Sequence, residues 1–262
     1  MTFSFRRVWA VLFRHLMIFV SPFQQINHFY WTLLDIVIFG FLTKSLAQSG
    51  DHYTTIILSN LVLWNFFSRG AINTGLTIEK DLSDFSFVGL LATPLNLAEM
   101  MVSQVLFSII GSLSSFFVAF LFVYFIFGLN VFSLGWQIFP AIGLLLVSGL
   151  AMGFLISTLL IAFGKKVSNN IYALAWLVVP FSCVFYPLEV LPHFAQKIAS
   201  YLPMAHVFEG LRAFIKHGDS LFKPFLISMG LNALYFIFAV LLFMIVFKRK
   251  KKVGFARLEL EV

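Results

Sequence analysis

The chain has 262 residues, of which 60% are hydrophobic and only 11% are charged, and its mean hydropathy is +0.96. A soluble domain is about 45–50% apolar and about 25% charged. This chain has too little polar surface to cover a water-soluble globule, so its composition predicts an integral membrane protein. The formal net charge of +7 does not indicate nucleic-acid binding, because the basic residues cluster at the ends of apolar runs and in the tail.

The chain lacks the common sequence motifs for catalysis and metal binding. Its single cysteine, Cys183, excludes an intrachain disulfide and a CxxC metal motif. No GxxxxGK[ST] phosphate loop, HExxH zinc motif or GxSxG nucleophile elbow occurs. We therefore expect no metal site, and we expect that this chain does not hydrolyse ATP itself.

Residues 1–22 predict an amphipathic helix that lies along the membrane surface. Apolar side chains share one helical face, at Phe5, Val8, Trp9, Leu12, Leu16 and Phe19. The opposite face carries Arg6, Arg7, Ala10 and Arg14. This pattern is typical of a helix in the interface, and the alternative is a ragged start to the first membrane span. We expect no cleavable signal peptide, because the segment has no small-residue cleavage site.

Six segments are long and apolar enough to cross the bilayer, which takes about 20 residues of helix. They are residues 28–47, 54–76, 98–127, 136–163, 171–186 and 224–247. Lipid penalises unpaired backbone groups, and no segment alternates as the strands of a barrel do. The predicted fold class is therefore an all-α membrane protein, a bundle of six transmembrane helices that forms a single domain.

The distribution of basic residues predicts the orientation of the bundle. With the N-terminus inside, 13 of the 18 lysine and arginine residues fall on the inner side. The positive-inside rule then places both termini in the cytoplasm and residues 187–222 on the outer side. The basic tail, residues 248–262, lies inside in this arrangement, where anionic lipid attracts its lysines.

The predicted inner loop, residues 77–97, is unusually acidic. It contains four charged residues close together, at Glu79, Lys80, Asp81 and Asp84. This charge pattern suggests a docking surface for a cytoplasmic protein, and the alternative is a solvated turn. At the end of the loop, Asn96 can cap the next helix and Glu99 lies in its first turn, as the helix dipole favours.

Polar residues inside the predicted spans mark a candidate path through the bundle. Asp35 in the first span and Arg69 in the second lie at similar depth, and we expect them to pair because an isolated charge there is costly. Asn65, Arg69 and Asn73 recur every four residues on one face of the second span. That face either contacts a transported substrate or forms hydrogen bonds between helices. Gly149 and Gly153 permit close helix packing, within one chain or between two copies.

The outer segment, residues 187–222, is broken into pieces that are too short to span the membrane. Three prolines, Pro187, Pro192 and Pro203, divide it. Its charged residues include Glu189 and a pair, Glu209 and Arg212, that are spaced to meet on one helical face. The segment is either re-entrant, dipping into the outer leaflet, or a plain loop on the surface.

Two stretches resemble the permease subunits of ABC-2 type exporters. "IEKDLSDFSFVGLLATPLNLAEMMVSQVL", residues 78–106, is similar to that family's inner loop and third span. "YPLEVLPHFAQKIASYLPMAHVFEGLRAFI", residues 186–215, is similar to its segment before the last span. The resemblance extends over nearly the whole chain.

The resemblance implies an exporter subunit of a bacterial inner membrane that pairs with a second permease copy. Separate ATP-binding cassette subunits would bind ATP and magnesium, so no cofactor is expected in this chain. By position, the N-terminal helix and the residues from Glu79 to Asp84 would contact those subunits. The outer segment would be re-entrant, and family substrates include drugs, lipids and lipid-linked glycans or polysaccharides.

Two other classes of protein are possible on the sequence alone. An ion-driven secondary transporter or channel would need coupling carboxylates inside the membrane, and only Asp35 is a candidate. An intramembrane enzyme would need a cluster of histidine with acidic residues, and the six histidines are scattered. Transport that depends on an ion gradient rather than on ATP would favour the first of these.

Overall fold

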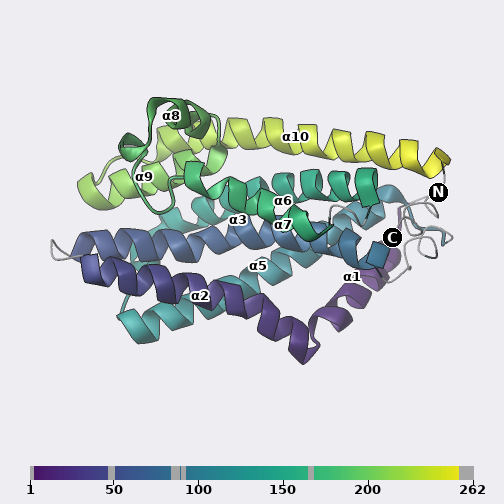
Figure 1. Cartoon of the computed structure of the whole chain (residues 1–262), viewed down its shortest axis with the longest axis horizontal. Coiled ribbons are helices and arrows are strands. Elements are labelled where there is room, and N and C mark those ends of the chain that lie inside the picture. Colours follow the sequence, from purple (N-terminus) through teal and green to yellow (C-terminus); the bar gives the residue numbers. More distant parts are fainter. Residues whose placement is uncertain (1–2, 47–50, 84–88, 90–92, 165–167, 254–262) are drawn as a thin grey trace.

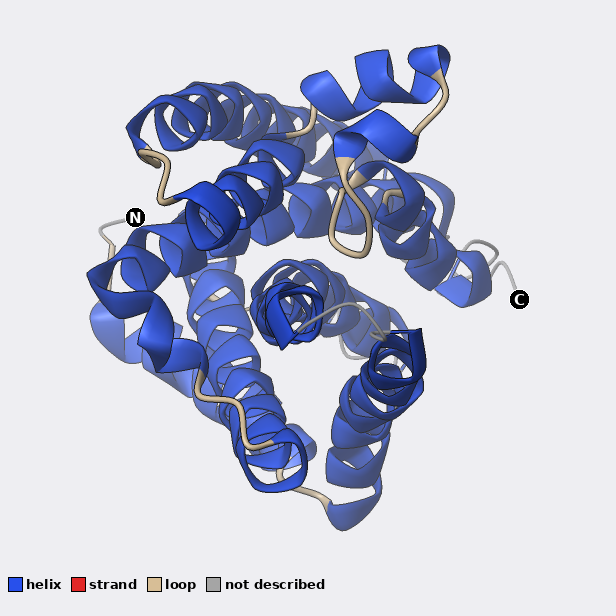
Figure 2. Cartoon of the chain, turned by 90° about the vertical axis from the view of Figure 1, so that its left-hand side faces the viewer, coloured by secondary structure: helices blue, strands red, loops and turns tan. Residues whose placement is uncertain are grey.

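The computed structural model describes residues 3–46, 51–83, 89, 93–164 and 168–253. Within these ranges every element is a helix, as Figure 2 shows, and the predicted all-α class is confirmed. The long helices are α1 (Phe5–Phe19), α2 (Pro22–Leu46), α3 (Asp51–Ser83), α5 (Leu97–Phe127), α6 (Ile138–Phe163) and α10 (Phe222–Val253). The shorter ones are α7 (Ser168–Leu177), α8 (His193–Ser200), α9 (Pro203–His217) and 3₁₀ turns at Val131–Gln137, Val179–Phe181 and Leu188–Val190.

Four stretches of the described chain are long and apolar enough to cross a membrane. They are Pro22–Ser45, Leu97–Phe127, Leu134–Phe163 and Phe222–Lys251, which match the predicted first, third, fourth and sixth spans. Helix α3 is long enough at 33 residues, but polar residues along its length lower its hydropathy. The count of six spans therefore stays a prediction.

The predicted fifth span, residues 171–186, is wrong as a single helix. Helix α7 has only 10 residues and ends at Leu177. Pro180 follows in the next turn and has no backbone N–H to donate to the preceding turn, so the α-helix cannot continue through it. A 3₁₀ turn, Val179–Phe181, and an irregular segment take its place.

Helix α3 lies against α6 at the centre of the bundle, where glycines allow a close approach. A Cβ atom on Gly149 would lie 3.0 Å from the carbonyl oxygen of Phe66, and one on Gly153 would lie 2.9 Å from that of Ala71. Contacts this short leave no room for a side chain. The glycine pair therefore serves packing within this chain.

The two ends of the bundle are formed by different helices. The start of α1 and the end of α10 lie together at one end, which we call the α1 end, and α8 and α9 lie at the other, the α9 end (Figure 1). This arrangement agrees with the predicted topology, in which the termini share one side and residues 187–222 lie on the opposite side.

Helix α1 has two apolar strips where the sequence predicts one. Val8, Leu12 and Phe19 are buried against the bundle, as expected, but Phe5 and Trp9 point away from it and are exposed. Phe13 and Met17 continue the exposed strip, because residues four apart lie on one side of a helix. The predicted single face, Phe5 to Phe19, is therefore wrong in this detail, and the position of α1 along the membrane surface stays a prediction.

The predicted inner loop begins later than expected. Helix α3 runs to Ser83, so Glu79, Lys80 and Asp81 lie in its last turns and not in a loop. The helix continues because Ile78 and Leu82 are buried in the core and fix these turns. Asp84 lies outside the described residues.

Candidate functional site

A cavity of about 300 Å³ lies between α2, α3 and α7. All four residues predicted to mark a path line it, namely Asp35, Asn65, Arg69 and Asn73. Its wall also contains His28, Trp31, Ser68 and Trp176. The polar face of α3 thus lines a cavity, and two of its residues, Asn65 and Arg69, also form the predicted alternative, hydrogen bonds between helices.

Arg69 is 6% exposed and is held by a hydroxyl group. Its Nε and Nη2 atoms donate to the Thr32 Oγ1 atom at 3.2 and 2.9 Å. The Thr32 hydroxyl in turn donates to Asn65 Oδ1 at 3.0 Å. Asn65 completes the chain by donating its Nδ2 to the carbonyl oxygen of Leu61 at 3.2 Å. These hydrogen bonds fix the direction of the guanidinium group, and the sequence pattern did not indicate Thr32 as its partner.

The expected ion pair between Asp35 and Arg69 is not formed. Both residues belong to the described part of the chain, and no nitrogen–oxygen distance of 4.0 Å or less joins them. Thr32 lies one helical turn before Asp35 on α2 and takes up the guanidinium group instead. The prediction compared how deep the two residues lie along their helices. It did not take into account the direction in which each side chain leaves its helix.

Asn73 and His28 show how polar the cavity is. Asn73 is fully buried, and neither atom of its amide group has a hydrogen-bond partner among the described residues. His28 Nε2 lies 2.6 Å from Ser115 Oγ and 3.2 Å from the carbonyl oxygen of Gly111. An unpartnered buried amide is uncommon in folded proteins and indicates a group that would bind to it. The contact between His28 and Ser115 was not predicted from the sequence.

A second polar cluster, at the α1 end, ties α1 to α5 through Glu99. The side chain of Glu99 is completely buried. Its Oε1 atom accepts hydrogen bonds from the Ser4 N–H at 2.7 Å and from Arg7 Nε and Nη2 at 3.0 and 2.7 Å. Its Oε2 atom accepts from the Asn96 N–H at 2.8 Å. Glu99 therefore does more than favour the start of α5, as the sequence predicted, because it also anchors α1.

Arg14 forms an ion pair with Asp81 at the same end of the bundle. His15 Nε2 lies 3.5 Å from the same carboxylate. Burial, with the nearby charges of Arg14 and Lys80, nevertheless lowers the pKa of His15 to about 3. The imidazole is therefore neutral at physiological pH, and the Asp81 carboxylate is engaged by Arg14.

The residues predicted to dock a partner fall into two groups. Arg7, Arg14 and Asp81 make contacts within the chain. Arg6 is exposed, whereas Glu79 and Lys80 are half-buried and also interact with other groups of the chain. The contacts within the chain hold α1 in place, so the exposed Arg6 is the clearest candidate for an external contact.

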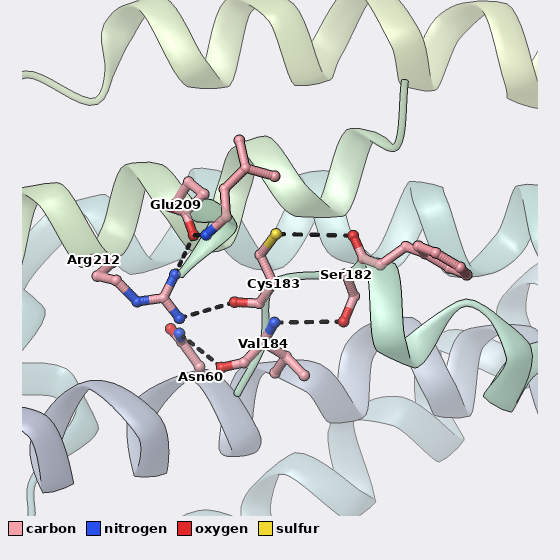
Figure 3. Close-up of polar contacts among 8 residues, drawn as sticks. Asn60, Ser182, Cys183, Val184, Glu209 and Arg212 are labelled. Atoms are coloured by element: carbon pink, nitrogen blue, oxygen red, sulfur yellow. Dashed lines mark hydrogen bonds and ion pairs between the residues drawn. The ribbon is translucent and has the colours of Figure 1, made fainter. Parts of the chain in front are cut away.

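A third cluster, at the α9 end, supports the broken segment after α7. Figure 3 shows that Arg212 and Asn60 reach this segment from α9 and α3. Arg212 forms an ion pair with Glu209, and its Nη2 donates to the carbonyl oxygen of Cys183 at 2.9 Å. Asn60 Nδ2 donates to the carbonyl oxygen of Val184 at 3.3 Å. Side chains of other helices thus satisfy two backbone carbonyl groups of the irregular segment.

The prolines of this segment act as predicted. Pro187 and Pro192 directly precede the 3₁₀ turn and α8, and Pro203 is the first residue of α9. The predicted pair Glu209–Arg212 is confirmed, and Glu209 also accepts a hydrogen bond from the Leu188 N–H at 2.9 Å. Glu189 is exposed. Whether the segment dips into the membrane stays a prediction.

A family model described as ABC-2 type transporter matches residues 4–215. The chain belongs to this family. The match extends from α1 to α9 and includes the cavity and both charged clusters. No curated protein matches the chain. As an ABC-2 family member with four apolar helices of membrane-spanning length, the chain is a multi-pass membrane protein and a transport subunit.

Proposed function

We propose that this ABC-2 protein is the permease of an ATP-driven exporter. It moves its cargo through a path that includes the cavity between α2, α3 and α7. The chain itself performs no covalent chemistry. ATP and magnesium bind to a separate ATP-binding cassette subunit, and the permease alternates between two conformations that the bound ATP biases.

The observation that supports this proposal is the cavity, which is lined by Asp35, Asn65, Arg69 and Asn73. Ionisable residues within a membrane bundle are costly and usually mark a substrate or ion pathway. Family membership favours an ATP-driven permease over the ion-driven transporter that Asp35 alone would suggest. Drugs, lipids and lipid-linked glycans are the cargo classes that the family admits.

The α1 end is the proposed docking surface for the ATP-binding subunit. Helix α1 bears the exposed Arg6, and the last turns of α3 bear Glu79 and Lys80. The pairs of the half-buried Arg7 and Arg14 with the buried carboxylates of Glu99 and Asp81 would make α1, α3 and α5 move together. A push on α1 would then reach α3, whose polar face lines the cavity.

The proposed setting is a bacterial inner membrane, with both ends of the chain in the cytoplasm and a second copy as partner. The charge distribution supports this orientation, because most lysines and arginines fall on the proposed inner side. The arrangement of α1 and α10 at one end and α8 and α9 at the other supports it too (Figure 1).

The test is affinity purification of the tagged protein from its native membrane, with mass spectrometry of the chains that accompany it. Wild type is compared with Arg6→Glu, which reverses the exposed charge on α1, and with Lys44→Glu, which reverses an exposed charge on α2 outside the docking surface. We expect an ATP-binding cassette protein with wild type and Lys44→Glu, and less of it with Arg6→Glu. Recovery of wild type without any ATPase would overturn the proposal.

A further inference from the structure

The cavity between α2, α3 and α7 holds two opposite charges that do not contact each other. Arg69 is buried and directs two of its three guanidinium nitrogens to Thr32. Its Nη1 atom makes no hydrogen bond with any described residue. Asp35 is half-buried, lines the same cavity, and accepts no hydrogen bond in the described part of the chain. The two charges attract each other across the cavity, but no ion pair joins them and neither has a hydrogen-bonded charged partner among the described residues.

The two charges together restrict what could enter the cavity. A simple anion would satisfy Arg69 but would be repelled by Asp35, and a simple cation would meet the opposite problem. A ligand that carries both charges satisfies both residues at once. The separation of Asp35 from Arg69 therefore favours the binding of a zwitterion over the binding of an ion with a single charge.

The other residues that line the cavity indicate the chemistry of the uncharged part of such a ligand. The buried amide of Asn73 offers both a donor and an acceptor without partners in the described chain. The indoles of Trp31 and Trp176 and the side chains of Ile72 and Leu76 supply apolar surface. A compact polar headgroup attached to an apolar body fits this combination.

We propose that the cavity binds a zwitterionic phosphate–ammonium headgroup, with the phosphate on Arg69 and the ammonium on Asp35. The planar guanidinium group presents donors in the geometry that phosphate oxygens accept. A primary ammonium brings three N–H donors to the Asp35 carboxylate, which accepts only. This inference rests on the proposed function, because it gives a substrate class to the cavity proposed as the cargo path.

The experiment measures lipid binding to the purified full-length protein in detergent by native mass spectrometry, without ATP. The probes are phosphatidylethanolamine, phosphatidylglycerol, which has no ammonium group, and phosphatidylcholine, whose ammonium has no N–H. We expect phosphatidylethanolamine to bind wild type about tenfold more tightly than either of the others. Soluble phosphoethanolamine is the competitor: displacement of the lipid indicates that the headgroup alone suffices, and no displacement indicates a lipid ligand, the headgroup preference standing in both cases.

Three variants test whether Arg69 binds the phosphate group and Asp35 binds the ammonium group. Arg69→Gln should lose about tenfold in affinity for phosphatidylethanolamine, whereas Arg249→Gln, which removes an exposed charge on α10, should bind as wild type does. Asp35→Asn should bind phosphatidylethanolamine and phosphatidylglycerol equally, and it supplies an answer even if Arg69→Gln does not fold.

Equal binding of phosphatidylethanolamine and phosphatidylglycerol to wild type would overturn the inference. So would an Arg69→Gln variant that binds as tightly as Arg249→Gln. A double variant, Asp35→Asn with Arg69→Gln, that is more stable than either single variant would show that the two charges simply neutralise each other. These failures are distinct from failure of the proposed function, because purification of an ATPase with the wild-type chain does not depend on the headgroup.

Discussion

Arg69 and Arg212 are buried to nearly the same degree, with 6% and 5% of their surface exposed. Arg212, at the α9 end, has a carboxylate partner in Glu209 and donates to the backbone of the broken segment (Figure 3). Arg69, in the cavity, forms hydrogen bonds only with the hydroxyl of Thr32 among the described residues, and no carboxylate lies within ion-pair distance of it there. We infer that the first arginine stabilises the fold, and the second is the one for which we propose a ligand. Partner chemistry, rather than burial, distinguishes a structural charge from a functional one.

The largest loss of stability in this comparison should come from Arg212→Gln. The change leaves the half-buried Glu209 carboxylate and the Cys183 carbonyl group without the donor that the buried Arg212 supplies, and we expect this to cost about 3 kcal/mol of unfolding free energy. Thermal unfolding in lipid nanodiscs measures it. Lys197→Gln, which removes an exposed charge on α8, is the matched control and should be close to neutral. If Arg212→Gln were as stable as the control, Arg212 would not be a structural charge and the contrast with Arg69 would be lost.

Glu99→Gln extends the comparison to a buried acid. Glu99 accepts charge-assisted hydrogen bonds from Arg7 and from two backbone N–H groups, so loss of its charge should cost about 2 kcal/mol. Hydrogen exchange should rise in α1 while the interior of α6 stays protected. Glu189→Gln, at an exposed position, should leave α1 unchanged. Unaltered exchange in α1 of the Glu99 variant would show that other contacts hold this helix.

His15 adds a buried group that stays neutral beside its charged neighbours. Its pKa is lowered to about 3 by burial and by Arg14 and Lys80, whereas an unfolded histidine titrates near pH 6.5. The unfolded state therefore binds the proton first, and stability should fall as the pH drops from about 6.5 towards 3, by up to about 1.4 kcal/mol per pH unit. Comparison of wild type with His15→Asn across this range isolates the effect. Identical pH profiles would mean that His15 is not the titrating group.

The smallest change in stability should come from Arg69→Gln. The variant loses two hydrogen bonds to Thr32 and also loses a buried charge that forms no ion pair with a described carboxylate, and these effects offset each other. We expect the unfolding free energy to change by less than about 1 kcal/mol. The same thermal assay gives the value. A loss as large as that of Arg212→Gln would place Arg69 among the structural charges and remove the contrast between the two arginines.

Sequence patterns predicted the cavity wall better than the contacts within it. The spacing of Asn65, Arg69 and Asn73 identified one face of α3, because helical periodicity depends only on the chain itself. The contact of Arg69 with Thr32 depends on how two helices are rotated against each other, which depth alone cannot give. The pairing of Arg7 with Glu99 joins residues 92 positions apart, and no local pattern encodes it.

The broken fifth span shows a second limit of the sequence pattern. Hydropathy favoured a continuous helix through residues 171–186, since the segment is almost entirely apolar. Pro180 was the available signal against it, and the structure follows the proline. The irregular backbone that results is tolerated because Asn60 and Arg212 supply donors from other helices.

The most direct test of the account follows the cavity while the complex uses ATP. Ser68 lines the cavity, so Ser68→Cys in a Cys183→Ser background places a single thiol there, and Ser45→Cys gives an exposed control on α2. The rate of maleimide labelling is measured in inside-out membrane vesicles with and without ATP and vanadate. Trapping the ATP-binding subunit should change the labelling rate at position 68 by about fivefold or more and leave the rate at position 45 unchanged. An unchanged rate at position 68, in vesicles whose ATPase is present and active, would contradict it.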